Sequence, residues 1–135
     1  MKKLLLAGIS AAMALAAAPA MAHHSFAAEF DANKPVKLTG TVTKIEWMNP
    51  HAYFYIDVKD TSGKVENWGL EMGSPNGLMR QGWTRNSLKI GDEVTVEGSM
   101  AKDGSKIANA KNVTLSNGTK LFAASSAPPA PQPQQ

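Results

Sequence analysis

Three histidines are the residues of this sequence best suited to metal chemistry: His23, His24 and His51. The first two directly follow Ala20-Met21-Ala22, which has the A-x-A pattern of a signal-peptidase cleavage site. Cleavage after Ala22 makes His23 the first residue of the mature protein. Its α-amine and its imidazole can then bind one metal ion together, so a single residue supplies two nitrogen ligands.

The third imidazole, from His51, would complete a T-shaped set of three nitrogens, and His24 could add another ligand. Neutral nitrogen donors in a tetragonal arrangement suit Cu(II). This arrangement, a histidine brace, resembles the copper sites of lytic polysaccharide monooxygenases and of periplasmic copper carriers. Oxygen ligands could come from Glu29 or Asp31, and a thioether from Met48. The sequence has no cysteine, so thiolate ligands are excluded.

Two other interpretations of these histidines remain open. Cleavage after Ala20 would leave Met21-Ala22-His23 at the N-terminus, where an amine, two amides and an imidazole can also bind Cu(II) or Ni(II). Pro19 lies inside that alternative cleavage site, which favours the cut after Ala22. Alternatively, the two N-terminal histidines are simply solvated and His51 caps a turn.

Residues 1–22 have the three parts of a secretory signal peptide: Lys2 and Lys3, an apolar run over residues 4–18, and the A-x-A site. The apolar run is shorter than the about 20 residues that a membrane span needs. We therefore expect cleavage and export to the periplasm or the medium. The mature protein is then expected to have no transmembrane segment.

The mature chain is nearly neutral. Removing 22 of the 135 residues leaves 113, and without Lys2 and Lys3 there are 12 basic and 11 acidic residues, a net charge of +1. This balance gives no electrostatic reason to expect nucleic-acid binding. A chain of this size can bury one modest core, so one domain is expected.

Alternating apolar and polar residues predict five strands, and a different pattern predicts one short helix. The strands are expected over residues 36–47, 52–58, 64–72, 93–98 and 107–115. The apolar phase slips near Thr43-Lys44, which indicates a bulge in the first strand. Ser74-Pro75 has the form of a helix N-cap followed by proline, and Gly82 can end that helix.

Three strands, a short helix and two strands follow the plan of an OB-fold. We therefore predict an all-β, five-stranded OB-fold-like Greek-key barrel over residues 23–122, with one short helix between strands three and four. Another small barrel or a sandwich is the alternative. Residues 123–135 contain only Ala, Ser, Pro and Gln, a composition that predicts a disordered tail.

Four aromatic residues suggest a different function. Tyr53 and Tyr55 are predicted on the strand face opposite Phe54, and Trp47 and Trp83 could lie near the same end. An OB-fold can stack a ligand on such a face. The alternative to copper is therefore a module that binds an envelope glycan, peptide or protein without metal, although the tryptophans could instead fill the core.

The acidic residues do not predict a catalytic pair. Glu66 and Glu71 lie on opposite faces of one predicted strand because five positions separate them. Glu93 and Glu97 share a face but have the pattern of solvated strand positions. The sequence contains no nucleophile motif and no glycine-rich phosphate loop. We therefore expect a binding protein rather than an enzyme.

Three stretches resemble a family of small exported bacterial proteins known only as a domain of unknown function. They are the His-His-Ser opening at residues 23–25, WMNPHAYFY at residues 47–55 and SPNGLMRQGW at residues 74–83. The resemblance extends over about residues 23–122. It implies export and a barrel-like fold, and it brings no established activity.

Overall fold

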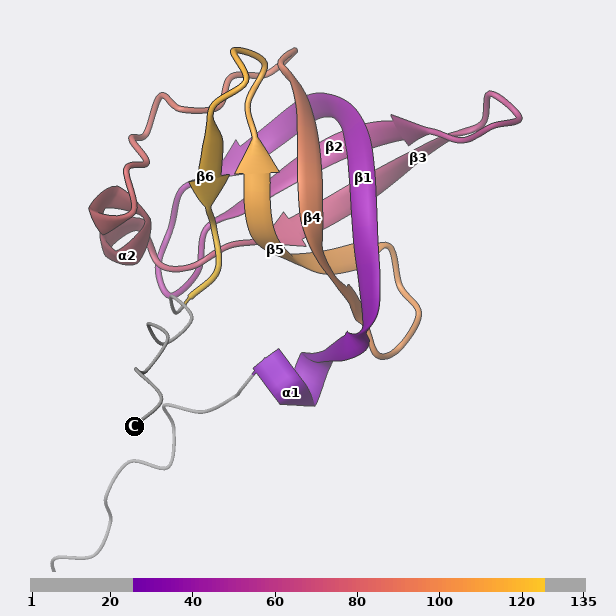
Figure 1. The fold of residues 1–135 in the computed structure, drawn as a ribbon, viewed down its shortest axis with the longest axis horizontal. Helices are drawn as coiled ribbons and strands as arrows, with labels where there is room; N and C mark the ends of the chain where they lie inside the picture. Colours follow the sequence, from indigo (N-terminus) through magenta and orange to yellow (C-terminus); the bar gives the residue numbers. More distant parts are fainter. Residues whose placement is uncertain (1–25, 126–135) are drawn as a thin grey trace, which may run out of the picture.

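A six-stranded sheet curled into a barrel makes up most of residues 26–125, the part of the chain that the computed structural model describes (Figure 1). The elements are α1 (Phe26–Glu29), β1 (Phe30–Glu46), β2 (Tyr53–Lys59), β3 (Val65–Glu71), α2 (Pro75–Arg80), β4 (Glu93–Ala101), β5 (Ile107–Thr114) and β6 (Lys120–Phe122). No helix within this range is both long enough and apolar enough to cross a membrane.

Five of the strands close the barrel. β1 pairs with β2 and with β4, β2 pairs with β3, and β4 pairs with β5, all antiparallel. The parallel pairing of β3 with β5, in which Leu70 lies opposite Ala108, completes the ring. With α2 between β3 and β4, this is the Greek-key plan of an OB-fold. The predicted fold class is confirmed.

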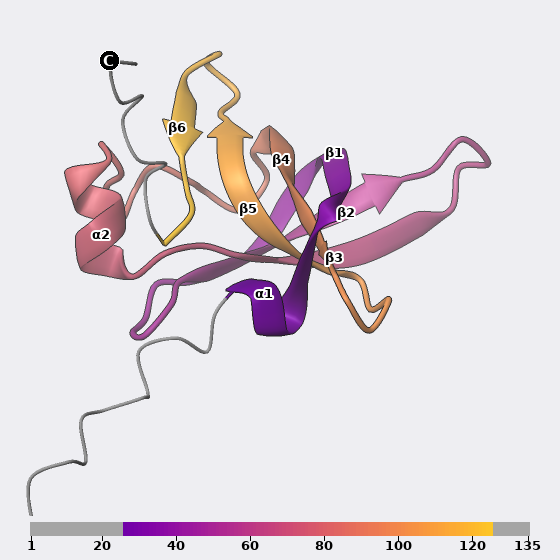
Figure 2. The same ribbon diagram turned by 60° about the horizontal axis from the view of Figure 1, so that its bottom comes forward.

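The predicted bulge in β1 is also present. Val42 lies opposite Ile56, but Lys44 lies opposite Tyr55, so Thr43 is the extra residue. A bulge bends its strand and increases the twist. In Figures 1 and 2, β1 is correspondingly the long bent strand that runs alongside both β2 and β4.

The helix α2 begins and ends at the predicted residues. The hydroxyl of Ser74 accepts a hydrogen bond from the backbone N–H of Gly77 at 3.2 Å, and Pro75 takes the first helical position. Gly82 follows the helix with φ 95°, a conformation that favours glycine. Figures 1 and 2 show α2 on the same side of the barrel as β6.

The strand β6 was not predicted. It pairs with β5 outside the closed ring, after a turn that contains Gly118. The chain stays attached beyond it, because Ala123 is fully buried and its backbone N–H donates to the carbonyl oxygen of Lys111 at 2.8 Å. Packing against the barrel therefore continues past residue 122, the predicted domain boundary. Residues 126–135 lie outside the described part of the chain.

Gly98 marks a close approach of β4 to β5. A Cβ atom at Gly98 would overlap the carbonyl oxygen of Asn109. Gly98→Ala must push the two strands apart, so we expect the free energy of unfolding to fall by about 1–3 kcal/mol, as for an overpacked site. Thermal unfolding measures this change. Ser99→Ala, next in the strand, should change it by no more than about 0.5 kcal/mol; an equal loss in both variants would contradict the explanation.

Candidate metal site

His51, Glu71 and Tyr53 form a hydrogen-bonded chain where β2 begins and β3 ends. Nδ1 of His51 lies 3.0 Å from Oε1 of Glu71. The hydroxyl of Tyr53 donates to Oε2 of the same carboxylate at 2.6 Å. Glu71 is only 6% exposed, whereas the His51 side chain is 35% exposed. A buried carboxylate thus holds a partly exposed imidazole by one of its two ring nitrogens.

The turn of the β2–β3 hairpin sets the register of the two strands that carry Tyr53 and Glu71. The carboxylate of Asp60 accepts hydrogen bonds from the backbone N–H groups of Ser62 and Lys64. These bonds and one from the Ser62 hydroxyl, which has the largest effect, lower the pKa of Asp60 and keep it charged at neutral pH. With the turn fixed in this way, pairing back along both strands places Tyr53 directly opposite Glu71.

The hydrogen-bonded ladder continues beyond the ends of the two strands. The backbone N–H of Ala52 donates to the carbonyl oxygen of Gly73 at 3.0 Å. Extended backbone places residues two apart on the same face. His51 and Tyr53 are two apart, and both reach the carboxylate of Glu71 from that face.

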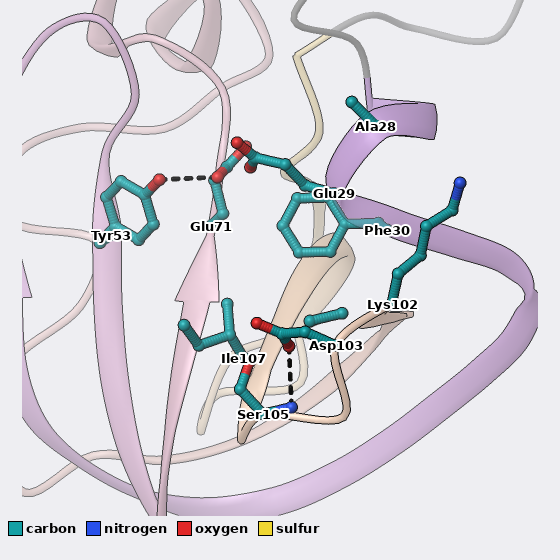
Figure 3. A pocket seen from close by; sticks show the side chains of 10 residues that line it. Ala28, Glu29, Phe30, Tyr53, Glu71, Lys102, Asp103, Ser105 and Ile107 are labelled. Atoms are coloured by element: carbon teal, nitrogen blue, oxygen red, sulfur yellow. Dashed lines mark hydrogen bonds between the residues drawn. The ribbon is translucent and has the colours of Figure 1, made fainter.

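A hollow of about 390 Å³ lies beside Tyr53 and Glu71 (Figure 3). It is lined by residues from α1, from all strands of the closed ring and from the β4–β5 loop: Ala28, Glu29, Phe30, Tyr53, Glu71, Ala101, Lys102, Asp103, Ser105 and Ile107. Figure 3 shows the carboxylates of Glu29 and Glu71 on the same side of the hollow. The first residues of the described chain therefore border the same space as Glu71.

Lys102 holds α1 in this position. Its backbone N–H donates to the carbonyl oxygen of Glu29 at 2.8 Å, and its ammonium group donates to the carbonyl oxygen of Ala27. Phe30, directly after α1, is 3% exposed and lies opposite Ala101 in β4. These contacts attach the beginning of the described chain to the barrel beside the hollow.

The hydroxyl of Tyr53 stays protonated and donates a hydrogen bond to Glu71. Burial of the phenol, followed by its hydrogen bond to the Glu71 carboxylate, raises the pKa of Tyr53 well above its ordinary value. Tyr55 has a parallel arrangement on the same strand face, where burial and a 3.2 Å bond to Glu46 also raise its pKa. Both hydroxyls are therefore hydrogen-bond donors at neutral pH.

The other predicted metal ligands that the structure describes do not join His51 and Glu71 in one group. His23 and His24 lie outside the described residues. Glu29 borders the hollow, Asp31 is partly buried two residues further along β1, and Met48 is 50% exposed in the β1–β2 loop. Within residues 26–125, no three histidine, aspartate or glutamate side chains come together in a group that could hold a metal ion.

The predicted aromatic ligand-binding residues divide into two pairs. Trp83 is 2% exposed and its indole N–H donates to the carbonyl oxygen of Phe122 at 2.8 Å. Trp47 is partly buried and packs against the core. These are the core positions that the sequence offered as the alternative for the tryptophans. Tyr53 and Tyr55 remain on the outer face of β2, each bonded to a carboxylate.

Glu71 is the central residue that sequence reasoning missed. The sequence pattern placed it only on the opposite face of the predicted strand from Glu66, with no role assigned. The hairpin turn was the signal that could have found it, since pairing outward from Asp60 and Lys64 already puts Glu71 opposite Tyr53. Its burial could not be foreseen, because its surroundings come from segments far apart in the sequence, including α1 and the β4–β5 loop, which border the same hollow.

The fold and these contacts define a small OB-fold-like barrel protein. Where β2 begins and β3 ends, a histidine and a phenol both lie within hydrogen-bond distance of one buried carboxylate. The chain belongs to DUF6152, a family of unknown function, whose match covers residues 11–110. No curated protein matches the sequence. The family match agrees with the resemblance noted from the sequence motifs, and it assigns no activity.

Proposed function

We propose that this protein is an exported Cu(II)-binding protein whose ligands are the mature N-terminus at His23 and the imidazole of His51. The observation that carries the proposal is the bond between His51 Nδ1 and the buried Glu71 carboxylate. That bond leaves Nε2 as the nitrogen for a metal. Histidine ligands in proteins typically donate their second ring N–H to a carboxylate in this way.

The position of α1 supports a contribution from the N-terminus. Ala28 and Glu29 border the hollow that Glu71 also lines, and Lys102 fixes α1 there. His23 precedes Phe26 by only three positions, a chain length of at most about 10 Å. This short connection would allow an N-terminal amine and imidazole to reach the end of the barrel that carries His51.

The nature of the ligands favours copper among the first-row metals. An amine and two imidazoles are neutral nitrogen donors, and Cu(II) binds such donors more tightly than the other divalent ions of the series. His24 is a further candidate ligand next to His23. The proposed role is to hold copper in the periplasm or outside the cell, with no catalytic step assigned.

The N-terminal residue and the Cu(II) affinity of the exported protein test the proposal. The protein is purified without an N-terminal tag, its first residue is read by mass spectrometry, and Cu(II) is titrated against a competing chelator. We expect His23 at the N-terminus, one tightly bound Cu(II) per chain and an electron paramagnetic resonance spectrum with nitrogen couplings. A different first residue, or only weak copper binding without nitrogen couplings, would contradict the proposal.

A further inference from the structure

Glu71 is a buried acid whose neighbours leave it short of positive charge. It is 6% exposed, and within residues 26–125 its only ion-pair partner is His51. The hydroxyl of Tyr53 is a neutral donor. Burying a carboxylate is costly unless a cation or several hydrogen bonds compensate it. A metal ion on the far side of the His51 ring would supply that compensation.

The two hydrogen bonds also fix the direction of the carboxylate. Oε2 is held by Tyr53 and Oε1 faces Nδ1 of His51, so both oxygens are engaged. A ring that donates from Nδ1 must present the lone pair of Nε2 to its other side. The Tyr53–Glu71 pair therefore selects both the tautomer and the orientation of His51.

We propose that Glu71, held by Tyr53, is a positioning residue that orients His51 and makes the copper site favour Cu(II) over Cu(I). This inference rests on the proposed copper function. A carboxylate one ring away from the metal attracts a doubly charged ion about twice as strongly as a singly charged one at the same place. The partial burial of the site reduces screening of that attraction.

Glu71→Gln tests this role because it removes the charge and keeps the shape of the side chain. We expect the affinity for Cu(II) to fall by about 10–100-fold, the usual effect of losing such a partner. The affinity for Cu(I) should fall less. Each tenfold difference between the two losses raises the Cu(II)/Cu(I) reduction potential by about 59 mV. Chelator competition for each ion and a redox titration measure these changes.

Glu66→Gln is the matched control in the same strand. It makes the same change of charge, but Glu66 is paired with Lys64 and Lys106 and lies five positions from Glu71. It should leave both affinities and the potential unchanged. Equal effects of the two variants would overturn the inference, because only the overall charge would then matter.

Tyr53→Phe provides a second variant that removes a single hydroxyl. Like Glu71→Gln, it should lower the affinity for Cu(II), but by a smaller factor. Thermal unfolding shows whether the barrel of each variant is intact. Unchanged affinities and potential in both folded variants would overturn the role of Glu71 and leave the proposed function standing. Failure of the unmodified protein to bind copper would instead overturn the proposed function, and the inference with it.

Discussion

His51→Asn is expected to weaken Cu(II) binding by roughly 100-fold or more, beyond the loss of about 10–100-fold that follows from removing an outer partner. The amide nitrogen of asparagine occupies nearly the position of Nδ1 in histidine. It can therefore still donate to Glu71, which keeps the buried carboxylate hydrogen-bonded. The ligand nitrogen Nε2 is lost. Chelator competition on the untagged mature protein measures the change.

The stability of His51→Asn is part of the same prediction. Because the bond to Glu71 is retained, thermal unfolding should be close to that of the unmodified protein, whereas leaving the carboxylate unpaired would cost about 1–3 kcal/mol. Met79→Leu, in α2, is the control for copper binding. Met79 is half exposed and is not among the candidate copper ligands. Unchanged Cu(II) affinity in His51→Asn would exclude His51 as a ligand.

Retaining Ala22 in front of His23, in a chain that also carries His24→Asn, is expected to have an effect of similar size. His24→Asn is included because Ala22-His23-His24 would otherwise offer Cu(II) an amine, two amides and a third-residue imidazole. The α-amine of His23 becomes a peptide N–H, which is not a metal donor while protonated, so the two-nitrogen chelate on one residue is lost. Copper affinity should fall and the nitrogen couplings in the paramagnetic resonance spectrum should change. A form that starts at His23 and carries the same His24→Asn is the control, because it differs only in lacking Ala22 and keeps the amine and the ring of His23.

Combining the two changes tests whether both groups bind one ion. Mutations that act on the same site are strongly non-additive, whereas distant independent sites add within about 0.5 kcal/mol. Adding His51→Asn to the chain that retains Ala22 and carries His24→Asn should therefore lower the affinity for Cu(II) much less than it does in the control that starts at His23. Full additivity would mean that His23 and His51 bind copper separately, which contradicts the proposed brace.

Much of the barrel was predictable from local patterns. The alternation of apolar residues located all five strands of the closed ring, and its slip near Thr43 located the bulge. Ser74-Pro75 and Gly82 marked both ends of α2 because capping and positive φ have strong residue preferences. β6 was not predictable in this way, since its three residues are too few to show a period.

The candidate site was only partly predictable from the sequence. The sequence pointed to His51 by residue type and by its place in the β1–β2 loop. Glu71 was placed only on the strand face opposite Glu66, with no role assigned to it. Its neighbours come from distant parts of the chain: Tyr53 donates to its carboxylate, and the hollow that it borders is also lined by Glu29 and Lys102. Such long-range neighbours leave no periodic signal in the chain.

A crystal structure of the copper-loaded mature protein, with anomalous diffraction measured at the copper absorption edge, would locate the metal and its ligands. We expect one copper ion bonded to the α-amine and ring of His23 and to Nε2 of His51, with Nδ1 of His51 still bonded to Glu71. Copper held by His23 and His24 alone, with His51 unbound, would contradict the proposed brace.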